Sequence, residues 1–180
     1  FAKNSKEEHL VLVEGYMDVI QLHQHGIDTA VATLGTALTP EQARIIKRIK
    51  NEVVISYDSD EAGQKATQRA IELLNEEGLR VRVLTMSGSK DPDDYIKANG
   101  VGAYRKLINE SQEQIEYKIR RLRSKYNLDD ISQKAEYVTQ AAKEFVNIKS
   151  PVECELYVKK VSAETGVSAE SIFAEIARIR

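Results

Sequence analysis

Cysteine is almost absent from this sequence: Cys154 is the only one among 180 residues. A single thiol excludes an internal disulfide and favours a reducing, cytosolic compartment, with the cysteine buried and inert. An excess of charge is also lacking, since the formal net charge is −2. No overall positive field therefore attracts nucleic acid, and any such contact is expected to be local. Apolar runs are too short to cross a membrane, and no secretory signal is recognisable, so no membrane partner is expected.

Apolar residues make up 42% of the sequence, which is enough to form a hydrophobic core. The length suits one ordinary domain, or a domain of about 100 residues followed by an extension. The chain starts at Phe1 without a methionine and reaches its first apolar run within its first ten residues. We therefore expect it to be a piece of a longer protein.

Strands and helices are predicted to alternate in the first part of the chain. Short apolar runs predict four strands, at 10–13, 29–34, 53–57 and 81–84. Segments with helical spacing and helix-start or helix-stop residues lie between them. This alternation predicts an α/β fold, with a mostly parallel four-stranded sheet flanked by helices over residues 8–100. Apolar residues recur only at helical spacing afterwards, so residues 101–180 are expected to form an all-α subdomain.

Acidic residues follow the predicted strands. Asp58 and Asp60 lie one residue apart at the end of the run Val53–Tyr57, so their side chains point the same way. Glu14 ends the first strand, and Asp91 and Asp93 follow the last. Parallel strands bring their carboxyl ends to one edge of the sheet, where open α/β folds bind ligands. Oxygen ligands without nearby cysteine or histidine favour Mg²⁺ or Mn²⁺, the usual equipment for phosphoryl or nucleotidyl transfer.

Each acidic residue also has a structural alternative. Asp60 and Asp91 stand where they would cap the following helices, and Glu14 would then be an ordinary strand end. The segment Thr33–Thr39 either seats a phosphate at a helix start or forms a plain turn. Weaker candidates for nucleotide contact, each of which would otherwise be a surface or supporting group, are Gly15, Asp18, Lys65 and Lys90.

Four sequence stretches resemble a known family. They are Val13-Glu14-Gly15-Tyr16-Met17-Asp18-Val19, Ala32-Thr33-Leu34-Gly35-Thr36-Ala37-Leu38-Thr39, Tyr57-Asp58-Ser59-Asp60-Glu61-Ala62-Gly63 and Lys90-Asp91-Pro92-Asp93-Asp94. The glutamate–glycine pair and the later Asp-x-Asp resemble the Toprim domain, and the full set resembles bacterial replicative DNA primases of the DnaG type. The resemblance covers about residues 8–100, and the later helices are similar, more loosely, to the helical subdomain of the primase core. Ser59 departs from the glycine that the family often has there.

The resemblance implies synthesis of short RNA primers from ribonucleoside triphosphates on a single-stranded DNA template, in the bacterial cytoplasm at the replication fork. Carried over, Asp58, Asp60, Asp91 and Asp93 hold one to three Mg²⁺ or Mn²⁺ ions, and Glu14 is a metal ligand or proton-transfer group. The family's zinc-binding and basic amino-terminal parts are expected upstream. Its domain for binding the replicative helicase is expected beyond Arg180, so this piece is not expected to prime alone.

Two other functions stay open at this stage. One is a Toprim nuclease or topoisomerase, although none of the eight tyrosines is marked out as a nucleophile by its neighbours. The other is a non-catalytic module of the RecR kind, which contacts DNA and proteins. The complete acidic set argues against the non-catalytic module. Measuring Mn²⁺ binding would distinguish a metal-dependent enzyme from such a module, which need not hold a metal.

Overall fold

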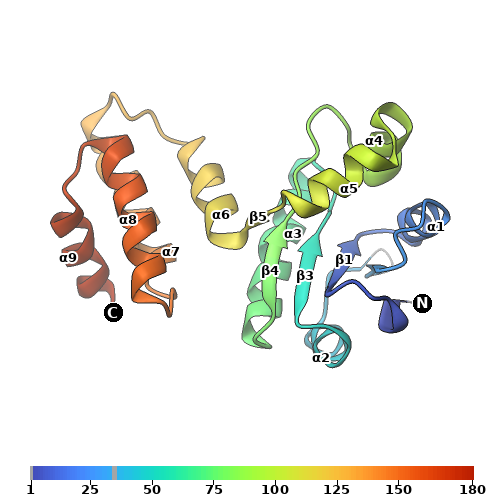
Figure 1. Ribbon diagram of the computed structural model, residues 1–180. Helices are drawn as coiled ribbons and strands as arrows, with labels where there is room; N and C mark the ends of the chain where they lie inside the picture. Colours follow the sequence, from blue (N-terminus) through green and yellow to red (C-terminus); the bar gives the residue numbers. More distant parts are fainter. Residues whose placement is uncertain (1, 34–35) are drawn as a thin grey trace. The chain divides into compact units, whose positions relative to one another are not determined.

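The predicted alternation of strands and helices is present in the computed structural model, which describes residues 2–33 and 36–180 (Figure 1). The chain divides into two units, Phe1–Gln114 and Ile115–Arg180. The first contains a short 3₁₀ helix at Ala2–Asn4, the strands β1 (His9–Val13), β2 (Ala30–Ala32), β3 (Glu52–Ile55), β4 (Arg80–Val83) and β5 (Gln112–Glu113), and the helices α1 (Tyr16–Gln24), α2 (Pro40–Ile49), α3 (Glu61–Glu76), α4 (Pro92–Asn99) and α5 (Val101–Asn109).

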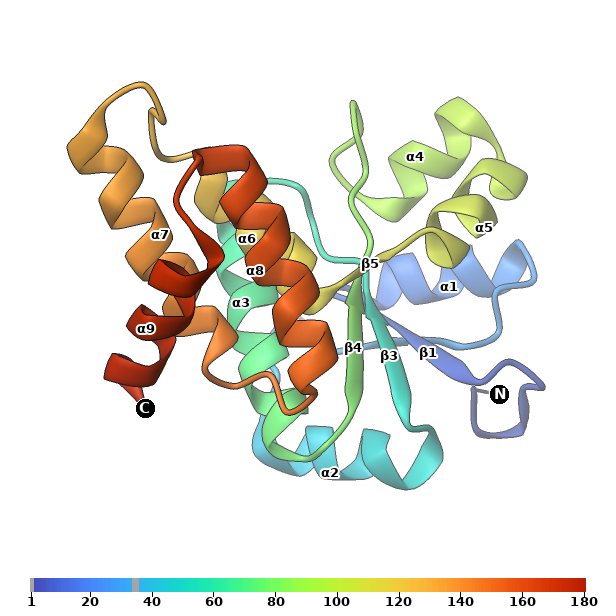
Figure 2. The same ribbon diagram turned by 60° about the vertical axis from the view of Figure 1, so that its left-hand side comes forward.

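The sheet of the first unit has the strand order β2-β1-β3-β4-β5. The first four strands are parallel, with Val11 opposite Val54 and Leu12 opposite Ile55, as the α/β prediction requires. Helices α1, α4 and α5 cover one face, and α2 and α3 cover the other (Figures 1 and 2). Because strand side chains alternate, Val11 and Val54 join the core under α1, while Leu12 and Ile55 are buried toward the opposite layer.

The sheet has one strand more than the four predicted. Strand β5 pairs antiparallel with β4, placing Glu113 opposite Arg82. Only two residues form it, and both are polar, so the sequence contains no apolar run that would predict this strand. Side-chain contacts hold it instead, since Glu113 pairs with Arg80, which also contacts Glu52.

The boundary between the units lies at residues 114 and 115, later than the predicted division at residue 100. Helix α5 explains the difference, because Tyr104 and Ile108 are buried in the same core as Val11. The Tyr104 hydroxyl also lies 2.7 Å from the Ser56 hydroxyl, just after β3. The sequence placed these residues in the helical extension over 101–180, because helical spacing does not show to which core a helix belongs.

Capping residues set the start of helix α2. Thr39 accepts a hydrogen bond from the backbone N–H of Gln42 at 3.3 Å, and the Gln42 side chain accepts one from the backbone N–H of Thr39 at 2.9 Å. The reciprocal pair is a capping box, with Pro40 in the first turn. Leu34 and Gly35, the expected end of the second strand, lie outside the described residues.

The second unit is helical. It comprises α6 (Gln114–Arg123), α7 (Ile131–Phe145), α8 (Pro151–Thr165) and α9 (Ala169–Ile179). Tyr137, Phe145, Val158 and Ile172 are fully buried in its core. Across residues 2–33 and 36–180, no helix is long and apolar enough to span a membrane.

Candidate functional site

Three loops bring acidic side chains to the carboxyl edge of the sheet. Glu14 follows β1, Asp58 and Asp60 follow β3, and Asp91 and Asp93 follow β4. Glu14 reaches the next loop directly, since its Oε1 accepts a hydrogen bond from the backbone N–H of Asp58 at 3.1 Å. The parallel register of β1 and β3 makes this contact possible, because it aligns their carboxyl ends.

Burial and mutual repulsion raise the pKa of two of these carboxyl groups, those of Glu14 and Asp58. For Glu14 the main cause is burial, followed by repulsion from Asp58 and Asp60, while the Asp58 N–H has the opposite effect. Burial also raises the pKa of Asp58, with Lys90 opposing it and Asp91 adding to it. Each carboxylate thus feels charges from a neighbouring loop, as convergence at one edge requires.

Asp18 belongs to the same edge. It lies on the first turn of α1, where its Oδ2 accepts a hydrogen bond from the backbone N–H of Gly15 at 3.2 Å. Burial raises the pKa of its carboxyl group, the Gly15 N–H lowers it, and repulsion from Asp91, Asp58 and Asp93 raises it further. Asp18 therefore faces the other acidic residues, and Gly15 positions it.

Asp60 and Asp91 both cap helices, as their structural alternative predicted. Asp60 Oδ1 accepts a hydrogen bond from the backbone N–H of Gly63 at 2.8 Å at the start of α3. Asp91 Oδ1 accepts one from the backbone N–H of Asp94 at 2.8 Å at the start of α4. Capping engages one oxygen of each carboxylate, so the two roles are compatible.

The lysines near this edge differ in their partners. Lys90 Nζ lies 3.8 Å from Asp58 Oδ2 and faces the site. Lys65 pairs with Glu61 at 2.7 Å, one turn away on α3, and both side chains are exposed. Asp93 pairs with Lys97 at 2.5 Å on α4. Of the two predicted lysines, only Lys90 thus contacts a predicted site residue.

Sequence reasoning did not assign a role to Gly63 or Ser59. A Cβ atom on Gly63 would lie 2.2 Å from the Asp58 carbonyl oxygen and 2.9 Å from Glu14 Oε1. The Ser59 hydroxyl donates to the carbonyl oxygen of Ser89 at 2.9 Å, and its N–H donates to that of Lys90 at 2.9 Å. Ser59 thus ties the β3–α3 loop to the β4–α4 loop. The one sequence signal for the role of Gly63 was its position, because a glycine in the first turn of a helix can indicate close approach of another segment.

The donor set suits a hard cation, because it consists of carboxylate oxygens whose repulsion a cation would relieve. Within the described ranges, however, no three acidic, histidine or cysteine side chains are arranged closely enough to hold an ion. Metal ligation would therefore require side-chain rearrangement.

Comparison with known proteins first defines the class. A family described as Toprim-like matches residues 11–96, and one described as the DnaB-helicase binding domain of primase matches residues 115–170. The sheet unit, with its acidic edge, is thus a Toprim-like domain. The second match adds a helicase-binding family within residues 115–170, where only the helical subdomain of the primase core was predicted, and it does not test the domain expected beyond Arg180. Apolar spacing predicted helices over residues 115–170 but carried no information about what they bind.

Individual relatives narrow the class further. The DNA primase of Clostridium acetobutylicum is 41% identical over 171 residues, which cover 95% of this chain and 28% of that protein. The crystal structure of a DNA primase domain from Pseudomonas aeruginosa has a TM-score of 0.75 and 35% identity, over 97% of this chain and 56% of that one. A DnaG primase catalytic domain bound to ssDNA has a TM-score of 0.76 and 26% identity, over 93% of this chain and 54% of that one.

This chain belongs to the bacterial DnaG-type primases. It spans 27–29% of the length of the first three curated relatives. Membership of this family implies a requirement for a divalent metal in general.

Proposed function

We propose that this chain supplies the metal-binding catalytic part of a DNA primase. The reaction is synthesis of short RNA primers from ribonucleoside triphosphates on a single-stranded DNA template, in the bacterial cytoplasm at the replication fork. The observation that carries the proposal is the convergence of carboxylates from three strand-end loops at one sheet edge. Glu14 and Asp58 make the direct contact between two of those loops.

In this proposal, Glu14, Asp58, Asp60, Asp91 and Asp93 hold one to three Mg²⁺ or Mn²⁺ ions. When bound, the ions supply charge neutralisation at the triphosphate and activation of the primer 3′-hydroxyl. Glu14 is a ligand or accepts the proton of that hydroxyl, and its raised pKa suits proton transfer.

Supporting roles follow from the contacts around the acidic edge. Asp18 and Gly15 shape the end of β1. Lys90 neutralises part of the Asp58 charge, and its ammonium would be available to the nucleotide phosphates if a cation held Asp58. Lys65 contacts nucleotide only by leaving Glu61, so it is the weaker of the two lysines.

The second unit is proposed to contact the replicative helicase. Support comes from the family matched over residues 115–170 and from exposed apolar side chains. Val152 and Leu156, one turn apart on α8, are 68% and 63% exposed. A charge placed at Leu156 should weaken helicase binding without changing Mn²⁺ binding.

A melting titration with Mn²⁺ tests the metal site. A cation that binds only the folded chain raises stability by about 2.7 kcal/mol at 100 times its dissociation constant. Asp58→Asn should leave the metal-free chain as stable or slightly more stable, because repulsion falls, and should blunt the Mn²⁺-induced rise in Tm. Ionic strength is held constant, since salt alone screens repulsion. Asp28→Asn, whose carboxylate accepts a hydrogen bond from Ser5 away from this edge, is the control. An unchanged Mn²⁺ response in Asp58→Asn would remove Asp58 from the ligand set.

Primer synthesis is tested by placing residues 1–180 in the Clostridium acetobutylicum primase in place of its matching segment. The chimera should synthesise template-directed primers, Asp58→Asn should abolish synthesis, and Asp28→Asn should not. A chimera that binds Mn²⁺ and template but makes no primer would contradict the proposed activity.

A further inference from the structure

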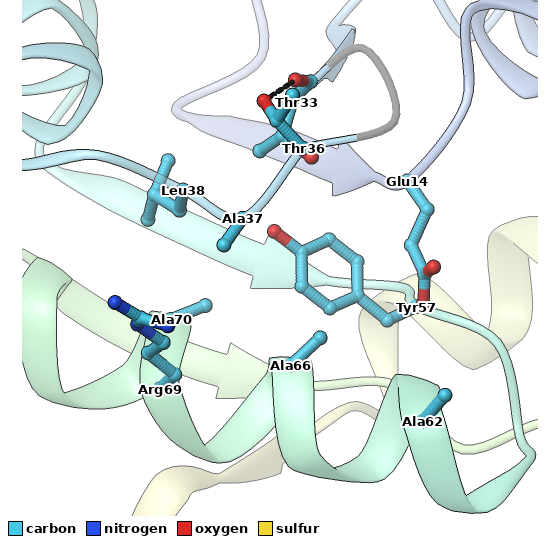
Figure 3. Close-up of a pocket in the computed structure, with 10 residues that line it drawn as sticks. All are labelled: Glu14, Thr33, Thr36, Ala37, Leu38, Tyr57, Ala62, Ala66, Arg69 and Ala70. Carbon is cyan, nitrogen blue, oxygen red and sulfur yellow. Dashed lines mark hydrogen bonds between the residues drawn. The ribbon is translucent and has the colours of Figure 1, made fainter.

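A cavity of about 260 Å³ opens between α3 and the segment 36–38, on the α2/α3 side of the sheet (Figure 3). Glu14 forms one end, so the cavity adjoins the acidic edge. Its size lies just below the range of about 300–1,000 Å³ that is typical of drug-sized ligands. The cavity therefore suits a small molecule.

Tyr57 projects across this cavity, with its ring at the centre and its hydroxyl pointing toward Ala37 and away from Glu14 (Figure 3). The residue is only 6% exposed. Its hydroxyl has no partner at hydrogen-bonding distance and angle, although the Thr33 hydroxyl is near enough to oppose the rise in pKa that burial causes. Buried polar atoms in folded proteins nearly always have a partner. An unpartnered hydroxyl aimed into a cavity therefore points to a ligand that supplies one.

Arg69 lines the cavity from α3, on the side to which the Tyr57 hydroxyl points (Figure 3). Its side chain forms no ion pair or hydrogen bond with any residue that the structure describes, whereas its neighbour Lys65 pairs with Glu61. A guanidinium presents several N–H donors in one plane, which matches the oxygens of a carboxylate or phosphate. The Arg69 end is therefore the anion-binding end.

The rest of the lining fixes the orientation of such a ligand. Ala66, Ala70 and Leu38 form an apolar wall beside the Tyr57 ring. Glu14 at the opposite end repels an anion there, so the charged group lies toward Arg69. An apolar or aromatic body then lies along the alanines.

We propose that this cavity is a binding site for a small organic anion, with a carboxylate or phosphate group at Arg69 and Tyr57 and an apolar body against α3. The site is distinct from the proposed metal ligands except at Glu14, and its ligand binds without a metal. The inference therefore stands independently of primer synthesis.

Benzoate and phenyl phosphate are suitable probes, with benzyl alcohol as the uncharged counterpart. Binding is followed by NMR of chains carrying ¹³C-labelled tyrosine, in which the Tyr57 signals are identified by their loss in Tyr57→Phe. Saturable shifts of the Tyr57 signals are expected with at least one anion, and not with benzyl alcohol at equal concentration. The tighter of the two anions identifies the preferred head group.

Variants test the two polar contacts. Arg69→Gln should weaken anion binding roughly tenfold or more, as expected for loss of a charged hydrogen bond, and Tyr57→Phe should weaken it severalfold. Arg69→Lys keeps the charge without the planar donors, so its affinity for the anion should lie between that of the parent and that of Arg69→Gln. Arg48→Gln removes an exposed cation of α2 outside the cavity and should change nothing. Thermal melts followed by circular dichroism verify that each variant is folded.

Three results would overturn the proposal. They are the absence of saturable Tyr57 shifts with both anions, equal binding of benzyl alcohol, and unchanged anion affinity in folded Arg69→Gln. The metal titration of Asp58→Asn is independent of all three.

Discussion

At the scale of single residues, Gly63 determines how closely the loops after β1 and β3 pack. Atoms of both loops occupy the space that a side chain at this position would need. The Asp58 carbonyl and the Glu14 carboxylate would both lie within 3 Å of a Cβ atom there. The same glycine donates its N–H to Asp60, which starts α3. Close approach of backbone, rather than backbone flexibility, therefore requires a glycine at this position.

Gly63→Ala should destabilise the chain by about 1–3 kcal/mol, the usual cost of forcing atoms into a packed site. Its Mn²⁺ response should fall as well, because Glu14 and Asp58 must move apart. Gly102→Ala is a matched control, since Gly102 is an exposed position of α5 and a Cβ there meets nothing within 4 Å. Gly102→Ala should raise the free energy of unfolding of the chain by a few tenths to about 1 kcal/mol. Urea unfolding of both variants checks the prediction, and a harmless Gly63→Ala would contradict it.

At the scale of elements, Ser59 joins the loop after β3 to the loop after β4. Its hydroxyl lies 2.9 Å from the Ser89 carbonyl oxygen and 3.3 Å from that of Lys90, and its N–H also reaches the Lys90 carbonyl. A glycine at this position keeps only the backbone bond. The side chain thus helps to hold one acidic pair against the other.

Ser59→Ala should lower the free energy of unfolding by about 0.5–1.5 kcal/mol, because the hydroxyl contacts are lost. It should also weaken Mn²⁺ binding severalfold, because the two loops separate more easily. Hydrogen exchange at residues 89–91 should accelerate, while exchange in α7 stays the same. Ser59→Thr, which keeps the hydroxyl, should restore slow exchange. Equal exchange in the alanine variant and the parent would show that the hydroxyl does not hold the loops together.

The sequence predicted those parts of the elements that depend on local patterns. The strand run before Asp58 is present in the structure, and helix-start and helix-stop residues such as Thr39 and Gly78 stand where α2 begins and α3 ends. The fifth strand was missed because two polar residues carry no periodicity. The cavity was missed for a related reason: Tyr57 and Arg69 are ordinary residues in sequence, and only tertiary packing buries the Tyr57 hydroxyl without a partner in a cavity that Arg69 lines.

At the scale of the whole molecule, a net charge of −2 combines with an edge where carboxylates gather. Affinity for DNA depends mainly on phosphate neutralisation, so that edge repels a template until cations bind it. Under the proposed function, the carboxylates of this edge therefore also oppose the approach of DNA.

This chain alone should bind a single-stranded oligonucleotide in EDTA more weakly than about 100 μM at physiological salt, the weak end of non-specific binding. Mn²⁺ should strengthen binding at constant ionic strength, and Asp58→Asn should bind better than the parent in EDTA. Fluorescence anisotropy measures both effects. Micromolar binding that ignores Mn²⁺ would show that another surface carries the DNA.

Strand β5 has a consequence for solubility. A parallel sheet exposes unpaired N–H and C=O groups along its outermost strand, where another chain can add. Two residues of β5 cover that side of β4, and the Arg80–Glu113 ion pair anchors them. The opposite border is β2, which is only three residues long and offers little to pair with. Loss of the Glu113 contact would uncover β4, so self-association through that border would be the first sign of damage there, ahead of any loss of metal binding.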